Sequence, residues 1–478
     1  MKGNKMQRRI FACIVFLLCL CTSLTTGWGT AEAKSEPAKQ PAFELGVATA
    51  DITPKLGMRM AGYFTTREAV GVIDPLYAKA MVFRQGEEMA ALIICDVISI
   101  KRPLSDEIRA EISKITGIPV SHISLTATHT HTGPAFRPLD SAQIEKLSKG
   151  EPYQQLLAEY VPFFKNRCVQ ACVNAKKVLK PATFQFGRTI TANISFNRRY
   201  YMKDGSVKCN PGLKNPNVVR PVGPTDPELS TLLFSDADKK PCASLTVFAL
   251  HLDTTGGNLF SADYPAYMAK ILGQKFGDDF ISIFGTGTCG DINHVDVNVS
   301  SLKELKKAPD IGLELGNMTL GIMQSGLQPV APTLKVASRK IQWPYHKFSA
   351  ERIAEAEKAV AESKDKKVSA KLSDLMVVAS LQSDPKGMPL EVQAYRLGPD
   401  TAIVTLPSEV FVDLGLAIKK ASPFPNTMVI ELADCILYVP TIKAFQEGGY
   451  ETHASLIEPG GGEKLVEMAI DCLNELKK

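Results

Sequence analysis

Residues 123–134 read ISLTATHTHTGP, a short strand-like segment that ends in two histidines one residue apart. In an extended backbone His129 and His131 point to the same side, because side chains alternate with a period of two. Two imidazoles on one side of a loop suit a divalent metal ion, for which neutral nitrogen is a donor. The spacing alone also fits one packed and one exposed histidine, so the metal site is a hypothesis at this point.

Reactive polar residues recur where other apolar segments end. His251 closes the run 244–250, and Glu409 follows the run 402–405. In open α/β sheets, the ends of strands and the loops that follow them are where sites assemble. The sequence therefore predicts a site at strand ends, to which two further residues with the same placement could belong, Asp291 and Tyr438.

Apolar and amphipathic segments alternate along the chain and predict an α/β fold. Strands are expected at 81–83, 90–95, 123–126, 244–250, 280–284, 402–405 and 428–432, and helices at 105–115, 153–179, 264–276, 350–363 and 463–477. The charged run 364–367 is expected to be a solvated turn. No repeat or linker divides residues 43–478, so we expect a single large domain with a mixed-sheet core and flanking helices.

Length and composition exclude several classes of protein. With 478 residues, 45% of them hydrophobic, the chain has the apolar mass that disordered proteins lack. Its 34 glycines and 30 prolines show no period, which excludes a collagen-like repeat. The 55 lysines and arginines nearly balance the 50 acidic residues without forming a basic cluster. Neither nucleic acid nor an anionic membrane is therefore indicated as a partner.

The N-terminus has the pattern of a secretory signal peptide. Basic residues precede an unbroken apolar run, and a small-x-small cleavage pattern follows at residues 31–33. We therefore expect residues 1–33 to be removed, residues 34–42 to form a linker, and the protein to be secreted or periplasmic. A lipoprotein anchor on Cys21 is the alternative, but Leu20 stands where such signals carry a small residue.

The cysteines do not form a metal-binding or redox pattern. The chain has 11 of them, none in a CxxC pair, and several lie within apolar runs. Most are therefore expected to be buried thiols. Cys168 and Cys172 are four residues apart on one face of an expected helix, which suits core packing.

The position of each candidate site residue also has an explanation that involves no metal binding or catalysis. His251 could cap a strand by bonding a backbone carbonyl. Glu409 follows Ser408, and an acid in the first turn of a helix complements the helix dipole. Asp291 lies in the segment GTGTCGDIN, which is no P-loop, and could stabilise a tight turn. His294 lies nearby and could join the site.

Segments that occur in the same order resemble the neutral ceramidases, the neutral/alkaline or non-lysosomal family of zinc-dependent amidases that hydrolyse N-acylsphingosine. They are LGVATADITP (45–54), MAGY (60–63), TATHTHTGP (126–134), Asn197-Arg198, Gly290-Asp291, LPSE (406–409) and the segment from Tyr438 to Tyr450-Glu451. Together they span nearly the whole chain after the signal peptide. The resemblance implies that the chain corresponds to the N-terminal catalytic domain of that family.

The resemblance implies one zinc ion per chain, with four ligands: His129, His251, Glu409 and Tyr438. A zinc ion that keeps an open position activates a water near neutral pH, and that water would attack the amide carbonyl. A phenol is an unusual zinc ligand, and a strand-end aromatic residue would ordinarily be interpreted as core packing. The role of Tyr438 as a zinc ligand therefore follows from the resemblance alone.

The resemblance also implies three residues that act on the reacting carbonyl. His131 would contact its oxygen, Arg198 would stabilise the negative charge that develops there, and Tyr450 would assist. The group that delivers a proton to the leaving amine is left open.

The sequence departs from the family pattern in two segments. Asn293-His294-Val295 stands where the family carries Ser-Pro-Asn, so a role for that serine does not transfer. Leu252-Asp253-Thr254-Thr255 stands where the family carries Pro-Thr-Ser. The chain also stops at Lys478, where relatives with a C-terminal β-sandwich domain continue, so we expect no such domain.

We therefore expect an exported zinc-dependent amidohydrolase that cleaves N-acylsphingosine or a related N-acyl lipid into a fatty acid and an amine. A zinc hydrolase acting on a different N-acyl or ester substrate is the first alternative. A non-catalytic secreted binding protein with a vestigial site is the second. The expected partner is a lipid or small-molecule amide, and transient contact with a membrane surface stays open.

Overall fold

A computed structural model describes residues 41–478 apart from residues 64, 367–370, 382–385 and 435–436. Residues 41–478 form one compact unit. The expected signal peptide, the anchor at Cys21 and the expected linker up to residue 40 lie outside the described residues. Within the described part, no helix is both long enough and apolar enough to cross a bilayer.

The larger of two main sheets has nine strands and mixed direction. Along the sheet they run β16-β14-β13-β8-β1-β5-β6-β7, and β18 pairs with β8. The pairs β6–β7 and β14–β16 are parallel, and the other pairs are antiparallel. The strands are β1 (Phe43–Asp51), β5 (Tyr77–Gln85), β6 (Glu88–Cys95), β7 (Ile123–Ala127), β8 (Lys180–Ile190), β13 (Glu228–Asp236), β14 (Pro241–Phe248), β16 (Ile281–Thr286) and β18 (Gln328–Val330).

The smaller sheet has four strands, β19 (Lys335–Trp343), β20 (Met388–Arg396), β21 (Thr401–Thr405) and β23 (Asn426–Ile430). Its pair β21–β23 is parallel. One face of this sheet packs on the larger sheet, because Tyr395, Ile403 and Met428 share a buried cluster with Phe83 and Leu245 of the larger one. The two sheets therefore form the centre of the molecule.

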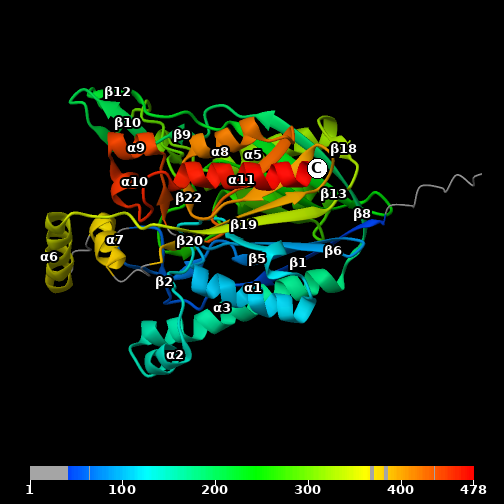
Figure 1. The fold of residues 1–478 in the computed structure, drawn as a ribbon, viewed down its shortest axis with the longest axis horizontal. Helices are drawn as coiled ribbons and strands as arrows, with labels where there is room; N and C mark the ends of the chain where they lie inside the picture. Colours follow the sequence, from blue (N-terminus) through cyan, green and yellow to red (C-terminus); the bar gives the residue numbers. More distant parts are fainter. Residues whose placement is uncertain (1–40, 64, 367–370, 382–385, 435–436) are drawn as a thin grey trace, which may run out of the picture. The chain divides into compact units, whose positions relative to one another are not determined.

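Helices cover the outer faces of both sheets (Figure 1). On the larger sheet lie α1 (Arg102–Thr116), α3 (Pro152–Lys177), α4 (Tyr264–Phe276) and α5 (Ala308–Ser325), while α2 (Ser141–Ser148) packs against α3. On the smaller sheet lie α8 (Val412–Ala421) and α11 (Gly461–Lys477), and α6 (Ala350–Lys366) packs with α7 (Leu372–Ser380). This α/β/β/α arrangement confirms the predicted mixed-sheet core with flanking helices.

Short elements in the connecting segments complete the fold. They are β2 (Arg59–Met60), β3 (Arg67–Glu68), β4 (Gly71–Val72), η1 (Val120–His122), β9 (Phe196–Asn197), β10 (Arg199–Met202), β11 (Val207–Cys209), β12 (Val218–Pro221), β15 (Leu259–Phe260), β17 (Ile292–Asn293), η2 (Leu302–Glu304), β22 (Glu409–Val410), β24 (Tyr438–Val439), α9 (Ile442–Glu447) and α10 (Tyr450–His453).

Two local predictions were wrong. Helix α6 continues to Lys366, so residues 364–366 are helical and not the expected turn, because nothing in that charged run breaks a helix. Ser408 does not cap a helix: Glu409 lies in β22, and α8 begins at Val412 after the N-cap residue Phe411. Glu409 therefore owes its position to strand pairing with β24 and not to a helix dipole.

The carboxyl ends of three parallel pairs meet at one edge. The hydroxyl of Thr286, at the end of β16, donates to the carbonyl of Thr128 just after β7, at 2.8 Å. The amide of Glu431, just after β23, donates to the carbonyl of Thr286 at 2.9 Å. These bonds join strands that are not neighbours within either sheet, so loops from distant parts of the chain come together there.

Candidate metal centre

His129 lies directly beyond β7 in a strained but well-anchored backbone conformation. Its φ of 72° is in the left-handed region, which costs a residue other than glycine about 1–2 kcal/mol. Its amide donates to the carbonyl of Val97 at 3.0 Å, and its Nδ1 donates to the carbonyl of Ile98 at 2.8 Å. Since Nδ1 carries the hydrogen, the lone pair of Nε2 is free to bind a ligand.

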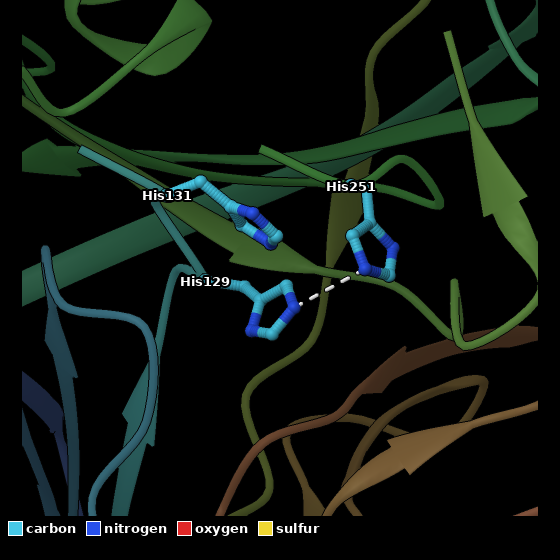
Figure 2. Close-up of side chains that lie close together, drawn as sticks. All are labelled: His129, His131 and His251. Carbon is cyan, nitrogen blue, oxygen red and sulfur yellow. Dashed lines mark hydrogen bonds between the residues drawn. The ribbon is translucent and has the colours of Figure 1, made fainter. Parts of the chain in front are cut away.

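His251 faces His129 from the loop after β14. Its Nδ1 donates to the carbonyl of Cys289 at 2.9 Å, which again leaves a lone pair on Nε2. The two Nε2 atoms lie 3.2 Å apart, joined by the dashed line in Figure 2. Two lone pairs at that distance repel each other unless a proton or a cation lies between them.

Glu409 completes a triangle with these two nitrogens. Its Oε2 lies 3.3 Å from Nε2 of His129 and 3.4 Å from Nε2 of His251, and this buried oxygen accepts no hydrogen bond. Burial opposes ionisation, yet the adjacent histidines hold the pKa of Glu409 well below its usual range. The carboxylate is therefore anionic, and the triangle offers one oxygen and two nitrogen donors.

The triangle fits a zinc ion. In a tetrahedral site with bonds of about 2.0–2.1 Å, donor atoms lie about 3.3–3.4 Å apart. The three measured edges are 3.2, 3.3 and 3.4 Å. Nitrogen and carboxylate donors of this kind suit zinc. The carbonyls of Ile98 and Cys289 fix the imidazole rings as second-sphere partners do in metal sites.

His131 borders the triangle, with its ring centre 4.9 Å from that of His129 and 5.5 Å from that of His251 (Figure 2). A nitrogen from each of the three histidines lies within 4.8 Å of the others. Neither ring nitrogen of His131 has a hydrogen-bond partner among the described residues. Burial and the neighbouring His129 lower its pKa to about 3, so the ring is neutral at pH 7. It can therefore bind either an ion or a substrate.

Arg198 follows β9 and enters the site from the side of His251. Its Nη1 lies 3.3 Å from Nε2 of His251, and its Nη2 donates to the carbonyl of Gly290 at 2.8 Å. Its Nε donates to Oε1 of Glu451 at 2.8 Å, and Glu451 is fully buried. This carboxylate neutralises and orients the guanidinium. Sequence reasoning missed its role, because the pair joins residues 253 positions apart.

Tyr438 and Tyr450 form the remaining wall. Tyr438 is paired with Glu409 in the β22–β24 ladder, and its ring centre lies 5.2 Å from Cζ of Arg198. The ring of Tyr450 packs edge-on against that of Tyr438 at 5.6 Å. Burial raises the pKa of Tyr450 to about 12, so its hydroxyl remains a hydrogen-bond donor at neutral pH.

Two buried acids behind the site hold its ligands in place and were not assigned this role from the sequence. Glu431 accepts from the amide of Val410 at 2.7 Å and from the thiol of Cys289 at 3.1 Å. Asp291 accepts from the amide of Val412 at 2.9 Å and from Asn197 at 2.8 Å. Asp291 therefore anchors the start of α8 and the segment that precedes Arg198, rather than cradling an anion.

Two cavities open beside the site. The smaller has a volume of about 440 Å³ and an apolar lining that includes Met60, Ile98, Leu375 and Leu437. The larger, of about 1150 Å³, is lined mainly by segments 206–212 and 447–453 and includes the charged residues Arg198, Lys208, Asp253 and Glu447. His131, Tyr438 and Tyr450 line both, as do Gly62 and Tyr63. The triangle therefore lies beside two hollows that share part of their walls.

The structure brings all seven residues implied by the resemblance to this edge. His129, His251 and Glu409 form the triangle, and the other four surround it: His131, Arg198, Tyr438 and Tyr450. Their roles in metal binding and catalysis stay predictions. His294 does not reach the triangle but lies against Asp253. Seven cysteines within the described residues are free, five of them buried, as expected; Cys435 lies outside those residues.

Comparisons with known proteins were made for the whole chain. Residues 43–299 match the family model described as neutral/alkaline non-lysosomal ceramidase, N-terminal. The chain is 26% identical over 272 residues to neutral ceramidase A of Dictyostelium discoideum, covering 54% of this chain and 36% of that protein. It is 24% identical over 264 residues to neutral ceramidase of Pseudomonas aeruginosa, covering 52% and 37%. The matched part thus spans little more than a third of these relatives.

The fold is similar to solved structures over more of the chain. The crystal structure of neutral ceramidase from Pseudomonas aeruginosa superposes with a TM-score of 0.70 at 18% identity, covering 92% of this chain and 75% of that one. A ceramidase complexed with C2 gives a TM-score of 0.66 at 16% identity, covering 91% and 75%. At this level of identity the likeness concerns the fold.

Proposed function

The chain belongs to the neutral/alkaline non-lysosomal ceramidase family, and we propose that it is a zinc-dependent amidase that hydrolyses N-acylsphingosine or a related N-acyl lipid. The single observation that carries the proposal is the triangle of two nitrogen donors and one oxygen donor, with edges of 3.2–3.4 Å, formed by His129, His251 and Glu409. Family membership supports the substrate class, and the donor set supports the metal.

His129, His251 and Glu409 would hold the zinc ion, with Tyr438 adjacent as the fourth ligand. When bound, zinc supplies Lewis acidity and makes a water molecule nucleophilic near neutral pH. Glu409 contributes the negative charge of the ligand set. The backbone carbonyls that hold Nδ1 of each histidine keep both Nε2 lone pairs directed at one point.

Three side chains can stabilise the charge that develops on the amide oxygen. His131 is neutral and can donate one ring N–H, Arg198 is cationic and is held by Glu451, and Tyr450 can donate its hydroxyl. Each well-placed donor of this type lowers the activation free energy by about 2.7–4 kcal/mol. Since Glu451 holds Arg198 before substrate binds, this side chain needs little reorganisation during the reaction.

The two cavities suit the two parts of an N-acyl amide. The smaller cavity, with its four aliphatic side chains, would take the fatty acyl chain, and the larger, with its charged side chains, would take an amine that carries hydroxyl groups. The scissile bond would then lie at their shared wall, beside His131 and Tyr450. We also propose that the enzyme acts after export, on the basis of the signal-like pattern in residues 1–33.

The test combines metal analysis with hydrolysis of a fluorescent short-chain ceramide in detergent. The purified protein should contain about one zinc per chain, and chelation should abolish fatty-acid release until zinc is restored. Glu409→Gln should lose both the zinc and the activity, because it removes the only carboxylate of the triangle. His122→Ala is the matched control, since His122 bonds the carbonyl of Met89 away from the site. Turnover that survives complete zinc removal would refute the proposal.

A further inference from the structure

Asp253 and His294 form a hydrogen-bonded pair beside the site. Nδ1 of His294 lies 3.0 Å from Oδ1 of Asp253, and because an ionised carboxylate only accepts, Nδ1 is the donor. The side chain of His294 is 8% exposed and that of Asp253 is 20% exposed. This bond fixes the orientation of the carboxylate.

The carboxylate of Asp253 faces the larger cavity. Asp253 lines that cavity together with His131 and Arg198. Within the described part of the chain, the bond from His294 to Oδ1 is the only side-chain hydrogen bond that reaches this carboxylate. A molecule that fills the cavity therefore meets an anionic oxygen that still lacks a partner.

The cations that share this cavity already have anionic partners. Arg198 is bonded to Glu451 at 2.8 Å. Lys208 lies at the rim with its side chain 55% exposed, 3.8 Å from Asp204. Neither is within ion-pairing distance of Asp253. The charge on Asp253 is therefore available to a ligand.

The backbone that carries Asp253 is fixed relative to the triangle. Asp253 is two residues beyond His251, and its own carbonyl and that of Thr255 accept from the hydroxyl of Tyr63 at 3.4 and 3.1 Å. The amides of Thr254 and Thr255 donate to the carboxylate of Asp263 at 3.1 and 2.8 Å. With His294 holding the side chain, the carboxylate has a defined place on the wall.

We propose that the Asp253–His294 pair is a specificity determinant that selects substrates whose amine part is uncharged or cationic and donates a hydrogen bond. Oδ2 of Asp253 would accept from a hydroxyl or ammonium group on that part. An amine part that carries a phosphate or carboxylate would be repelled by the carboxylate of Asp253. This inference rests on the proposed function, because it takes the larger cavity as the site of the amine.

The two residues also belong to the two segments at which the sequence departs from the family pattern, Leu252–Thr255 and Asn293–Val295. They are 41 positions apart in the chain, and only the fold brings them together. The two departures from the family pattern thus come together in one structural feature, which consists of a carboxylate and the histidine that orients it.

The experiment compares two substrates that differ only in the amine part, N-dodecanoylsphingosine and its 1-phosphate, with the zinc-loaded protein. The wild type should favour the uncharged substrate in kcat/KM. Asp253→Asn should narrow that ratio by about tenfold or more, mainly through a higher KM for the uncharged substrate and a gain for the phosphate. His294→Ala should change the ratio in the same direction but by less, because the carboxylate remains and only its orientation is lost.

Asp238→Asn is the matched control: it removes the same charge from an exposed residue in the turn between β13 and β14, at the opposite end of β14 from His251, and it should leave the ratio within about twofold. Zinc content and urea unfolding of each variant check the metal site and the fold. A ratio that Asp253→Asn leaves unchanged would overturn the proposal.

A second measurement separates this inference from the proposed function. If the zinc-loaded wild type releases no fatty acid from either substrate, the proposed function fails, and binding of 2-aminododecan-1-ol then tests the pair by itself. Asp253→Asn should weaken that binding by about fivefold or more, and Asp238→Asn should not. Equal dissociation constants in the wild type and Asp253→Asn would overturn the inference whether or not the protein is an amidase.

Discussion

Glu451→Gln tests whether a buried charge behind the site holds Arg198 in place. Glu451 is fully buried, and its Oε1 accepts from Nε of Arg198 at 2.8 Å. Its Oε2 lies 3.5 Å from Nε of Arg199, which is also buried. The substitution keeps the size and one acceptor of the side chain but removes the negative charge. Arg198 then stays in the interior without its compensating carboxylate.

The size of the effect follows from the geometry. Two opposite unit charges 2.8 Å apart attract by about 6 kcal/mol at an effective dielectric constant of about 20. Part of this is offset, because the variant no longer has to desolvate the Glu451 carboxylate. Breaking a buried pair by removing one partner typically costs about 3–5 kcal/mol. We expect the free energy of unfolding to fall by that amount.

Urea unfolding at pH 7 measures the loss, and a double-mutant cycle assigns it to the pair. Arg198→Met combined with Glu451→Gln should cost at least about 2 kcal/mol less than the sum of the two single changes, because the double variant leaves no unpaired charge on either side. Glu159→Gln is the control, since its pair with Lys55 joins side chains that are 57% and 74% exposed, and it should cost about 1 kcal/mol or less. Additive costs, or a loss below about 1 kcal/mol for Glu451→Gln, would refute the reasoning.

Two further predictions concern a glycine and a buried acid. Gly62→Ala would place a methyl group 2.5 Å from Cβ of His131, at a residue whose φ is 96°. We therefore expect kcat for ceramide to fall by about tenfold with zinc content unchanged. Gly205→Ala is the control: its φ is 81° and the space around it is open, so it should show backbone strain alone and leave kcat unaltered. Burial opposes the ionisation of Glu391, but hydrogen bonds and charge from Arg109 and Arg102 lower its pKa to about 2 from the usual 4.5. Its stabilising effect is complete above the unfolded pKa and is lost as the pH falls toward the folded one. The stability difference between the wild type and Glu391→Gln should therefore shrink by about 1–1.5 kcal/mol between pH 6 and pH 3.5 in urea unfolding, and a constant difference would contradict the assignment.

The parts of the fold that the sequence predicted are those fixed by local pattern. Continuous apolar runs gave the strands that end before His129 and His251, and amphipathic spacing gave α4 with its observed bounds, Tyr264–Phe276. The face-to-face packing of two sheets could not be predicted in the same way, because it depends on contacts such as those of Met428 with strands far away in the chain. The single-domain core was predictable, but its layer order was not.

For the candidate site, too, some residues could be predicted from local sequence and others could not. Histidines at strand ends stand out because the chain has only seven of them. Glu409 was interpreted as the first turn of a helix, because a proline and a serine before an acid favour that start; the partner that makes it a strand, β24, comes almost thirty residues later. Glu451 and Glu431 carry no local signal, since a buried acid is recognisable only from the groups it faces.

The backbone conformation at the site explains why its geometry could not be predicted from local sequence. His129, Ser408, Leu432 and Leu437 all have φ between 65° and 72°, a conformation that costs residues other than glycine about 1–2 kcal/mol each. Each is held by bonds to another segment: the amide of Leu432 donates to the carbonyl of Ser408, and the amide of Glu409 donates to the carbonyl of Leu437. None of these four residues would favour this conformation without the bonds that hold it. The close approach of three donor atoms around one point is therefore a product of the two sheets meeting, and a change that loosens their contact should reduce metal binding even where no ligand is touched.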